Sequence, residues 1–178
     1  MDSFYEQPFI KKQPTGSERM KNMALLVGGM LITVLLAVGG ILMLGKGFVT
    51  FIMLILAAAA GYGTFFMFRN TKVEYEYTFT NGDLDIDKII AQSSRKPMIS
   101  IQVSKFTDFG KYDGSAPEES ADMTVIMATD NIASHEYYAD FPHEDYGSTR
   151  LVFAPDEKML NHIKKALHPA LKNKNLSS

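Results

Sequence analysis

Two long apolar runs lie back to back near the start of the chain, and they constrain its fold more than any other feature. They cover Met23–Leu44 and Phe48–Phe68, with only Gly45-Lys46-Gly47 between them. Neither run contains Asp, Glu, Lys, Arg or His. A helix rises about 1.5 Å per residue, so each run can cross a hydrocarbon layer about 30 Å thick. Because a charge inside that layer is costly, the sequence predicts a two-helix membrane hairpin.

Composition divides the chain after the second run. Residues 1–72 carry seven Lys or Arg against three Asp or Glu, whereas residues 73–178 carry eleven against seventeen. We expect a flexible cytoplasmic tail over 1–22, the transmembrane hairpin over 23–68, one soluble domain over 73–172 and a second tail over 173–178. An acidic domain is a poor partner for phosphates, so we expect no nucleic-acid partner.

Basic residues gather on the two flanks of the hairpin. The flanks carry Lys11, Lys12, Arg19, Lys21, Arg69 and Lys72, whereas the connecting turn carries only Lys46. Cytoplasmic flanks of membrane helices collect Lys and Arg, so the count predicts a cell-membrane protein with two spans and both termini in the cytoplasm. The first run is about twice as long as the apolar part of a signal peptide, so we expect it to be retained.

Small residues recur at fourfold spacing inside both runs. They are Gly29, Thr33 and Ala37 in the first run and Ala57 and Gly61 in the second. Small side chains let two helix backbones approach closely in lipid, so we expect these five residues to pack the hairpin on itself. The alternative is a homo-oligomer that packs through the same faces.

The soluble part opens with a strand and a tight turn. Val73–Thr80 alternates apolar and polar residues, which indicates a half-buried strand. Asn81-Gly82 follows, and this pair favours a two-residue hairpin turn into a second strand over Asp83–Ile90. That turn predicts two apolar cross-strand pairs, namely Phe79 with Leu84 and Tyr77 with Ile86.

The remaining chain predicts more strands and then a helix. The strand-like segments are Met98–Phe106, Met123–Thr129, His135–Phe141 and Thr149–Ala154. After Pro155 the apolar residues advance by helical steps to Leu167, and Pro169 is expected to end or kink that helix. The polar break over Gly110–Asp122 is expected to be a loop. We therefore predict an α+β domain of antiparallel strands with one amphipathic helix at its C-terminal end.

This arrangement resembles a known family. The hairpin, the segment Tyr75–Phe79, the turn Asn81-Gly82 and the terminal helix are together similar to bacterial pleckstrin-homology-like (PH-like) membrane proteins of the YcxB-like kind. The resemblance covers roughly residues 23–172. It implies a strongly bent antiparallel sheet closed by one C-terminal helix, and it carries over no catalytic or ligand-binding residue.

Two groups of side chains contain residues that commonly bind metals, but neither group has the spacing of a known metal site. Asp83, Asp85 and Asp87 resemble the start of a calcium loop, but Lys88 and Ser94 stand where that loop needs Gly and Glu. The second group matches no zinc pattern and consists of His135, Glu136, Asp140, His143, Glu144 and Asp145. The chain has no cysteine. We therefore expect no metal, no cofactor and no catalytic site.

Three functions remain open from the sequence. The first is a non-enzymatic, membrane-anchored binding or scaffold module, whose partners are the lipid bilayer and a membrane or cytoplasmic protein, including a second copy of the chain. The alternative is an accessory subunit of a transport or channel assembly that acts through its hairpin. A hydrolase built on the His135–Asp145 group is the weakest. The basic segment Ser93–Lys96 is read as a loop, or as a contact for lipid headgroups.

Overall fold

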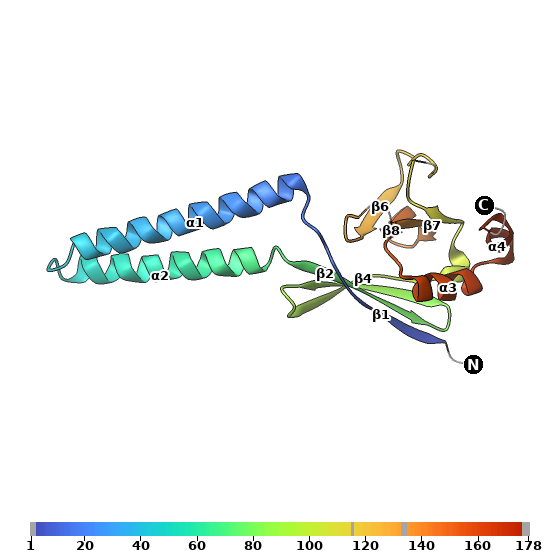
Figure 1. Cartoon of the computed structure of the whole chain (residues 1–178), viewed down its shortest axis with the longest axis horizontal. Coiled ribbons are helices and arrows are strands. Elements are labelled where there is room, and N and C mark those ends of the chain that lie inside the picture. The colour runs from blue at the N-terminus through green and yellow to red at the C-terminus, as the bar shows by residue number, and fades with distance from the viewer. Residues whose placement is uncertain (1–2, 115, 133–134, 176–178) are drawn as a thin grey trace. The chain divides into compact units, whose positions relative to one another are not determined.

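The computed structural model describes residues 3–114, 116–132 and 135–175 (Figure 1). The chain forms two compact units. One unit is the stretch Pro14–Lys72, and the other combines Met1–Gln13 with Val73–Ser178. The second unit therefore contains chain from both sides of the first, and each unit is described by itself below.

The first unit is a pair of long helices, α1 (Gly16–Leu42) and α2 (Phe48–Arg69). They run antiparallel and side by side (Figure 1). Both are long and apolar enough to cross a membrane, by length and composition. Only 6% of each apolar window is buried within the structure, which distinguishes these helices from the buried core helix of a soluble protein.

Helix α1 begins well before the apolar run that predicted it. Thr15 and Glu18 form a capping box, in which the Thr15 hydroxyl accepts from the Glu18 N–H at 3.3 Å and Glu18 Oε2 accepts from the Thr15 N–H at 2.9 Å. These bonds satisfy backbone donors at the helix start. The expected tail over 1–22 is therefore wrong from residue 16 onward, because the cap rather than hydrophobicity sets the first turn.

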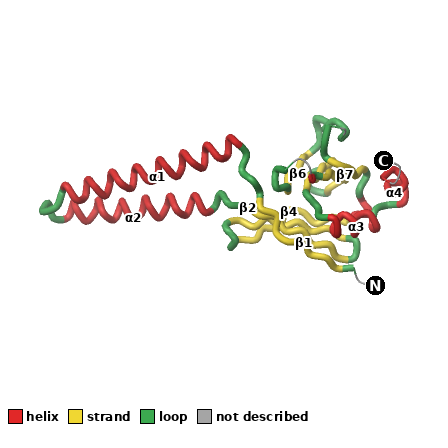
Figure 2. The backbone as a smooth tube through the Cα atoms, viewed as in Figure 1, coloured by secondary structure: helices red, strands yellow, loops and turns green. Residues whose placement is uncertain are grey.

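The second unit contains a sheet of four antiparallel strands in the order β1-β2-β3-β4 (Figure 2). The strands are β1 (Phe4–Lys11), β2 (Val73–Thr80), β3 (Asp83–Ile90) and β4 (Ser94–Gln102). The predicted register of the central hairpin is confirmed, since Phe79 lies opposite Leu84 and Tyr77 opposite Ile86. Strand β4 starts four residues earlier than expected, and the predicted end of that strand is a 3-10 turn, η1 (Val103–Lys105).

Strand β1 corrects the first half of the tail prediction. It pairs with β2 on both sides of an irregularity between Gln7 and Ile10, and the side chain of Gln7 is buried. Gln7 Nε2 donates to the Ala154 carbonyl at 3.0 Å, and the Asp156 N–H donates to Gln7 Oε1 at 2.8 Å. Tyr5 Oη donates to the Asp156 carboxylate at 2.5 Å. Residues 4–11 are thus ordered by a sheet partner and by buried hydrogen bonds.

The apolar residues of this segment lie on both faces of the strand. Tyr5 and Ile10 pack against the core of the second unit. Phe4 and Phe9 point away from it and are 64% and 51% exposed. The segment therefore docks on the domain through one face of the strand and leaves two aromatic rings on the other face.

A second sheet has the order β5-β7-β8-β6. Its strands are β5 (Asp108–Lys111), β6 (Thr124–Ala128), β7 (Tyr137–His143) and β8 (Gly147–Phe153). Strands β6 and β8 run parallel, so the prediction of a purely antiparallel sheet is wrong for this pair. Alternation along a strand shows which face is buried but not the direction of its neighbour. Strand β5 has four residues and was missed inside a longer break.

Two short helices follow, α3 (Glu157–Ala166) and α4 (Pro169–Asn175), where one was expected. Pro169 separates them because its ring removes a backbone donor and suits a first helical position. Met159 and Ile163 on α3 are fully buried. The tail expected over 173–178 is helical to Asn175, and residues 176–178 lie outside the described residues.

One hydrophobic core joins both sheets and both short helices. Its central polar contact is the hydroxyl of Tyr77, which donates to the Ala128 carbonyl and accepts from the Ala154 N–H. Burial strongly raises the pKa of this hydroxyl. The second unit is therefore a single domain, and the helix pair is inserted into it between β1 and β2.

We predict that the domain folds without the helices when β1 is kept. The Lys12 N–H donates to the Val73 carbonyl at 2.9 Å, so the two strand ends already meet. Replacing residues 14–72 with a turn of about four residues should give a soluble protein with one cooperative thermal transition.

The matched control is residues 73–178 alone. This fragment lacks β1, exposes the edge of β2 and leaves backbone groups at Ala154 and Asp156 without Gln7. It should be less stable by several kcal/mol or aggregate. An equal melting temperature for the two proteins would show that β1 is not part of the folding unit.

Candidate functional site

The contact seam of the helix pair is built from small residues. A side chain added at Gly29 would place its Cβ 2.1 Å from Thr64 Oγ1, so the backbone of α1 approaches Thr64 too closely for any other residue. A Cβ added at Gly61 would meet the Thr33 methyl group at 3.4 Å. The two helices therefore touch at Gly29 with Thr64 and at Thr33 with Gly61.

The structure places each of the five predicted packing residues on or near this seam. Gly29, Thr33 and Gly61 make the approaches just described, Ala57 is buried, and Ala37 is half-buried. Thr64 was missed. It follows Ala57 by seven residues and therefore lies on the same face of α2, which is the signal that could have found it. Self-packing of the hairpin stays a prediction, and so does its alternative, assembly with another copy.

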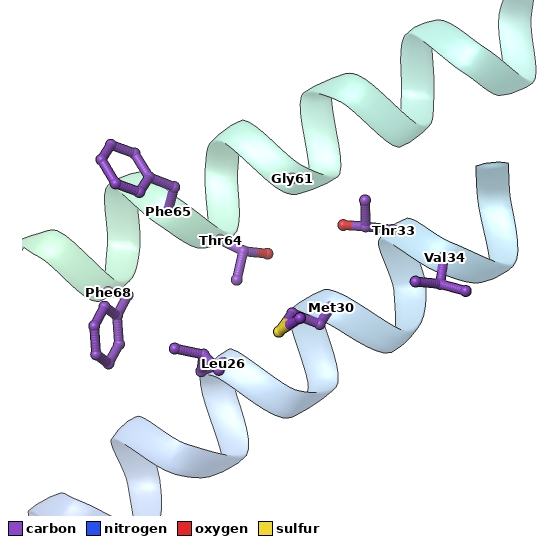
Figure 3. Close-up of a pocket in the computed structure, with 8 residues that line it drawn as sticks. All are labelled: Leu26, Met30, Thr33, Val34, Gly61, Thr64, Phe65 and Phe68. Carbon is purple, nitrogen blue, oxygen red and sulfur yellow. The ribbon is translucent and has the colours of Figure 1, made fainter.

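An interhelical cavity opens beside the seam (Figure 3). Its volume is about 290 Å³, and its lining comes from both helices: Leu26, Met30, Thr33, Val34, Gly61, Thr64, Phe65 and Phe68. The Thr33 hydroxyl donates to the Gly29 carbonyl and the Thr64 hydroxyl to the Ala60 carbonyl, each at 2.8 Å. Both hydroxyls are thus used within their own helices, and the cavity is apolar.

A second hollow, the polar groove, lies on the domain. It has a volume of about 520 Å³ and is lined by strands β2, β3 and β4 and by residues around the turn between β7 and β8: Thr78, Asp85, Asp87, Pro97, Met98, Ile99, Ser100, His143, Asp145 and Tyr146. The fold thus brings Asp85 and Asp87 to the same groove as His143 and Asp145, although the two pairs are far apart in the sequence.

The turn at one side of the polar groove is held by ring stacking. The rings of His143 and Tyr146 stack with centroids 4.7 Å apart, and His143 Nδ1 accepts from the Asp145 N–H at 3.1 Å. Tyr146 is 47% exposed. The groove therefore offers carboxylates and an open aromatic ring, which together suit a ligand with a cationic group.

Two other members of the predicted metal group, Glu136 and Asp140, lie outside the groove and have structural partners. Glu136 is buried and accepts from the Thr129 hydroxyl at 2.5 Å. Asp140 accepts two hydrogen bonds from Arg150, each at 2.7 Å. No three His, Asp or Glu side chains converge as metal ligands within residues 3–114, 116–132 and 135–175. The absence of a metal site from the whole chain stays a prediction.

Arg150 is the most deeply buried charge of the domain, with 1% of its surface exposed. Besides binding Asp140, its guanidinium lies 4.7 Å from the centre of the Tyr138 ring and donates to the Pro117 carbonyl at 2.7 Å. The hydrogen bond to Asp140 raises the pKa of Arg150. Arg150 therefore holds the polar break after Gly110 against the second sheet, and no sequence pattern pointed to this role.

The basic segment Ser93–Lys96, read from the sequence as a loop, belongs largely to strand β4. A guanidinium nitrogen of Arg95 lies 2.6 Å from Glu76 Oε2, and Glu76 is buried. Burial raises the pKa of Glu76, Arg95 opposes that rise, and a hydrogen bond with Glu6 adds to it. Arg95 is thus committed in part to a carboxylate of its own sheet.

We predict that Gly29→Leu disrupts the helix pair, because the new side chain must displace Thr64. Gly28→Leu is the matched control, since a Cβ at Gly28 meets nothing within 4 Å. Both variants replace a glycine of α1 with leucine, so the change in helix propensity is the same. Thermal melting of the full chain in detergent, followed by circular dichroism at a helical wavelength, should show a lower transition for Gly29→Leu only. Equal melting of the two variants would place the seam elsewhere.

Comparison with known proteins gives one match. A family model described as "Bacterial PH-like domain (DUF6106)" matches residues 1–172, which include β1, both long helices and both sheets. Neither the curated proteins nor the solved structures gave a match. The match confirms the PH-like resemblance and does not support the YcxB-like name. Because it covers nearly all of the 178 residues, the chain belongs to the bacterial PH-like domain family DUF6106.

Proposed function

We propose that this chain is a non-enzymatic, membrane-anchored binding module that holds a PH-like domain at the cytoplasmic face of the cell membrane. The observation that carries the proposal is the insertion of two long apolar helices between β1 and β2. These strands are hydrogen-bonded neighbours in one sheet.

The insertion supports a chain that crosses the bilayer twice and returns to the side from which it started. Strands that pair in one sheet must lie in the same compartment, so the chain has to return to the side from which it left. Two helices do this and one helix cannot. The flanks carry six Lys or Arg and the turn carries Lys46 alone, which favours the cytoplasm for the domain.

The polar groove supports the binding role. It is the hollow on the domain in which side chains from three strands and a turn meet, and it is open to solvent. The buried ionisable groups Arg150, Asp140 and Glu136 lie outside it and are engaged with partners inside the domain. We propose a membrane or cytoplasmic protein as the ligand of the groove, with a second copy of this chain as one case.

The alternative, a transport or channel subunit that acts through the hairpin, has less support. A polar substrate needs polar groups along its path through the bilayer. The hydroxyls of Thr33 and Thr64 donate to carbonyls of their own helices, and the cavity beside them is apolar. A mostly apolar path tends to exclude water, so the described helices favour an anchor.

Topology is the first test. We expect a reporter enzyme that is active only outside the membrane to be inactive when fused before Met1 or after Ser178, and active when inserted after Lys46. Each fusion is paired with a cytoplasm-active reporter at the same position as a control for expression. Outside activity at either terminus would contradict the cytoplasmic assignment, and opposite results at the two termini would contradict the hairpin.

Partner capture is the second test. We expect a photoreactive residue at Tyr146, in the polar groove, to give a discrete protein adduct in intact membranes. The same residue at Glu118, an exposed loop position outside the groove, should not. The adduct should persist when residues 23–68 are exchanged for an unrelated two-span hairpin. Loss of the adduct in a correctly inserted chimera would show that partner binding depends on the native helices.

A further inference from the structure

The interhelical cavity is closed on one side and open on the other. The contacts of Thr33 with Gly61 and of Gly29 with Thr64 close its floor. Its rim residues Met30, Val34 and Phe65 are 58%, 54% and 63% exposed. Figure 3 shows Leu26, Met30 and Phe68 pointing into the gap between the helices and Phe65 turned outward. A guest can therefore enter sideways, from whatever surrounds the helices.

The chemistry of the lining limits that guest to hydrocarbon. Both hydroxyls in the cavity already donate to carbonyls of their own helices, so a polar ligand would find no free donor there. An unfilled cavity of this size loses dispersion contacts along its walls. Cavities with such apolar walls stay dry and take up apolar molecules.

The cavity is elongated and has one charged end. From Leu26 to Val34 the helix axis advances about 12 Å. Arg19 lies seven residues before Leu26 and therefore shares its face of α1, and on α2 Arg69 directly follows Phe68. The other end stops at Val34 and Gly61, inside the apolar part of both helices. The guest thus has an apolar body along the cavity and an anionic group at the cationic end.

We infer that the interhelical cavity is a binding site for one acyl chain of an anionic phospholipid, with the headgroup beside Arg19. Charge complementarity and an apolar, side-opening cavity together select this occupant over a neutral lipid or a polar metabolite. The inference rests on the membrane insertion in the proposed function, and it does not depend on the orientation of the chain or on its protein partner.

The test is native mass spectrometry of the full chain in mild detergent, titrated with phosphatidylglycerol or with phosphatidylcholine of the same acyl chains. We expect the monomer to retain one phosphatidylglycerol in preference to phosphatidylcholine. Val34→Trp, which fills the cavity from its rim, should weaken retention by at least about tenfold. Leu35→Trp is the matched control, since Leu35 is 70% exposed and does not line the cavity.

The headgroup contact has its own pair of variants. Arg19→Gln should remove the preference for phosphatidylglycerol and keep acyl-chain retention, whereas Lys46→Gln in the distant turn should change neither. Leu26→Trp fills the cavity from its other end and should weaken lipid retention in the same way. It replaces Val34→Trp in the test if that variant fails to fold. Circular dichroism verifies that each variant is helical.

Three results would overturn the inference. They are no retained lipid, equal retention by Val34→Trp and Leu35→Trp, and a dimer that forms in place of the lipid-bound monomer. Extraction of membranes with alkaline carbonate separates this failure from failure of the proposed function. A chain that stays in the membrane but retains no lipid refutes the lipid site alone, whereas a chain that is released refutes the anchor and the lipid site together.

Discussion

The pairing of β1 with β2 joins the two separate parts of the chain that form the domain. These strands are neighbours in one sheet, yet the whole helix pair separates them in the chain. Closing such a long loop has an entropic cost that grows only slowly with its length. The helix pair reduces that cost, because antiparallel helices joined by a tight turn return the chain close to the point where it left.

Buried hydrogen bonds make the pairing specific. Gln7 on β1 bonds the backbone of Ala154 and Asp156, just before α3, and Tyr5 bonds the Asp156 side chain. Asp156 in turn caps α3 by accepting from the Met159 N–H at 2.7 Å. Each buried polar group that lost its partner would destabilise the domain, so the set favours one register of β1. The N-terminal strand therefore connects the first sheet to the helix that completes the core.

The interhelical cavity and the polar groove differ in chemistry, and each matches its surroundings. The polar groove lies on the domain, where water can solvate its carboxylates and a charged partner can displace that water. The interhelical cavity lies between apolar helices, where Thr33 and Thr64 satisfy their hydroxyls internally. Each hollow is thus suited to one medium, and the proposed module divides its work accordingly, with lipid at the helices and protein at the domain.

The features that could be predicted from the sequence are local. Apolar length predicts α1 and α2, alternation and the Asn81-Gly82 turn predict β2 and β3 with their register, and helical periodicity predicts α3. Each of these signals lies within one element or between two elements joined by a tight turn. The capping box of Thr15 and Glu18 is also a local signal, so the start of α1 could have been predicted from it. Hydrophobicity alone placed that start at Met23.

The contacts between distant segments follow from the fold and could not be predicted from the sequence. Residues 4–11 of the expected tail form β1 because they pair with the edge of β2. Tyr5 bonds Asp156, which is 151 residues away in the sequence. The parallel pairing of β6 with β8, the Arg150–Asp140 pair and the polar groove likewise depend on contacts between separate elements. Hydrophobic periodicity predicts which face of a helix or strand is buried, but it does not predict which other element packs on that face. These features therefore depend on tertiary packing.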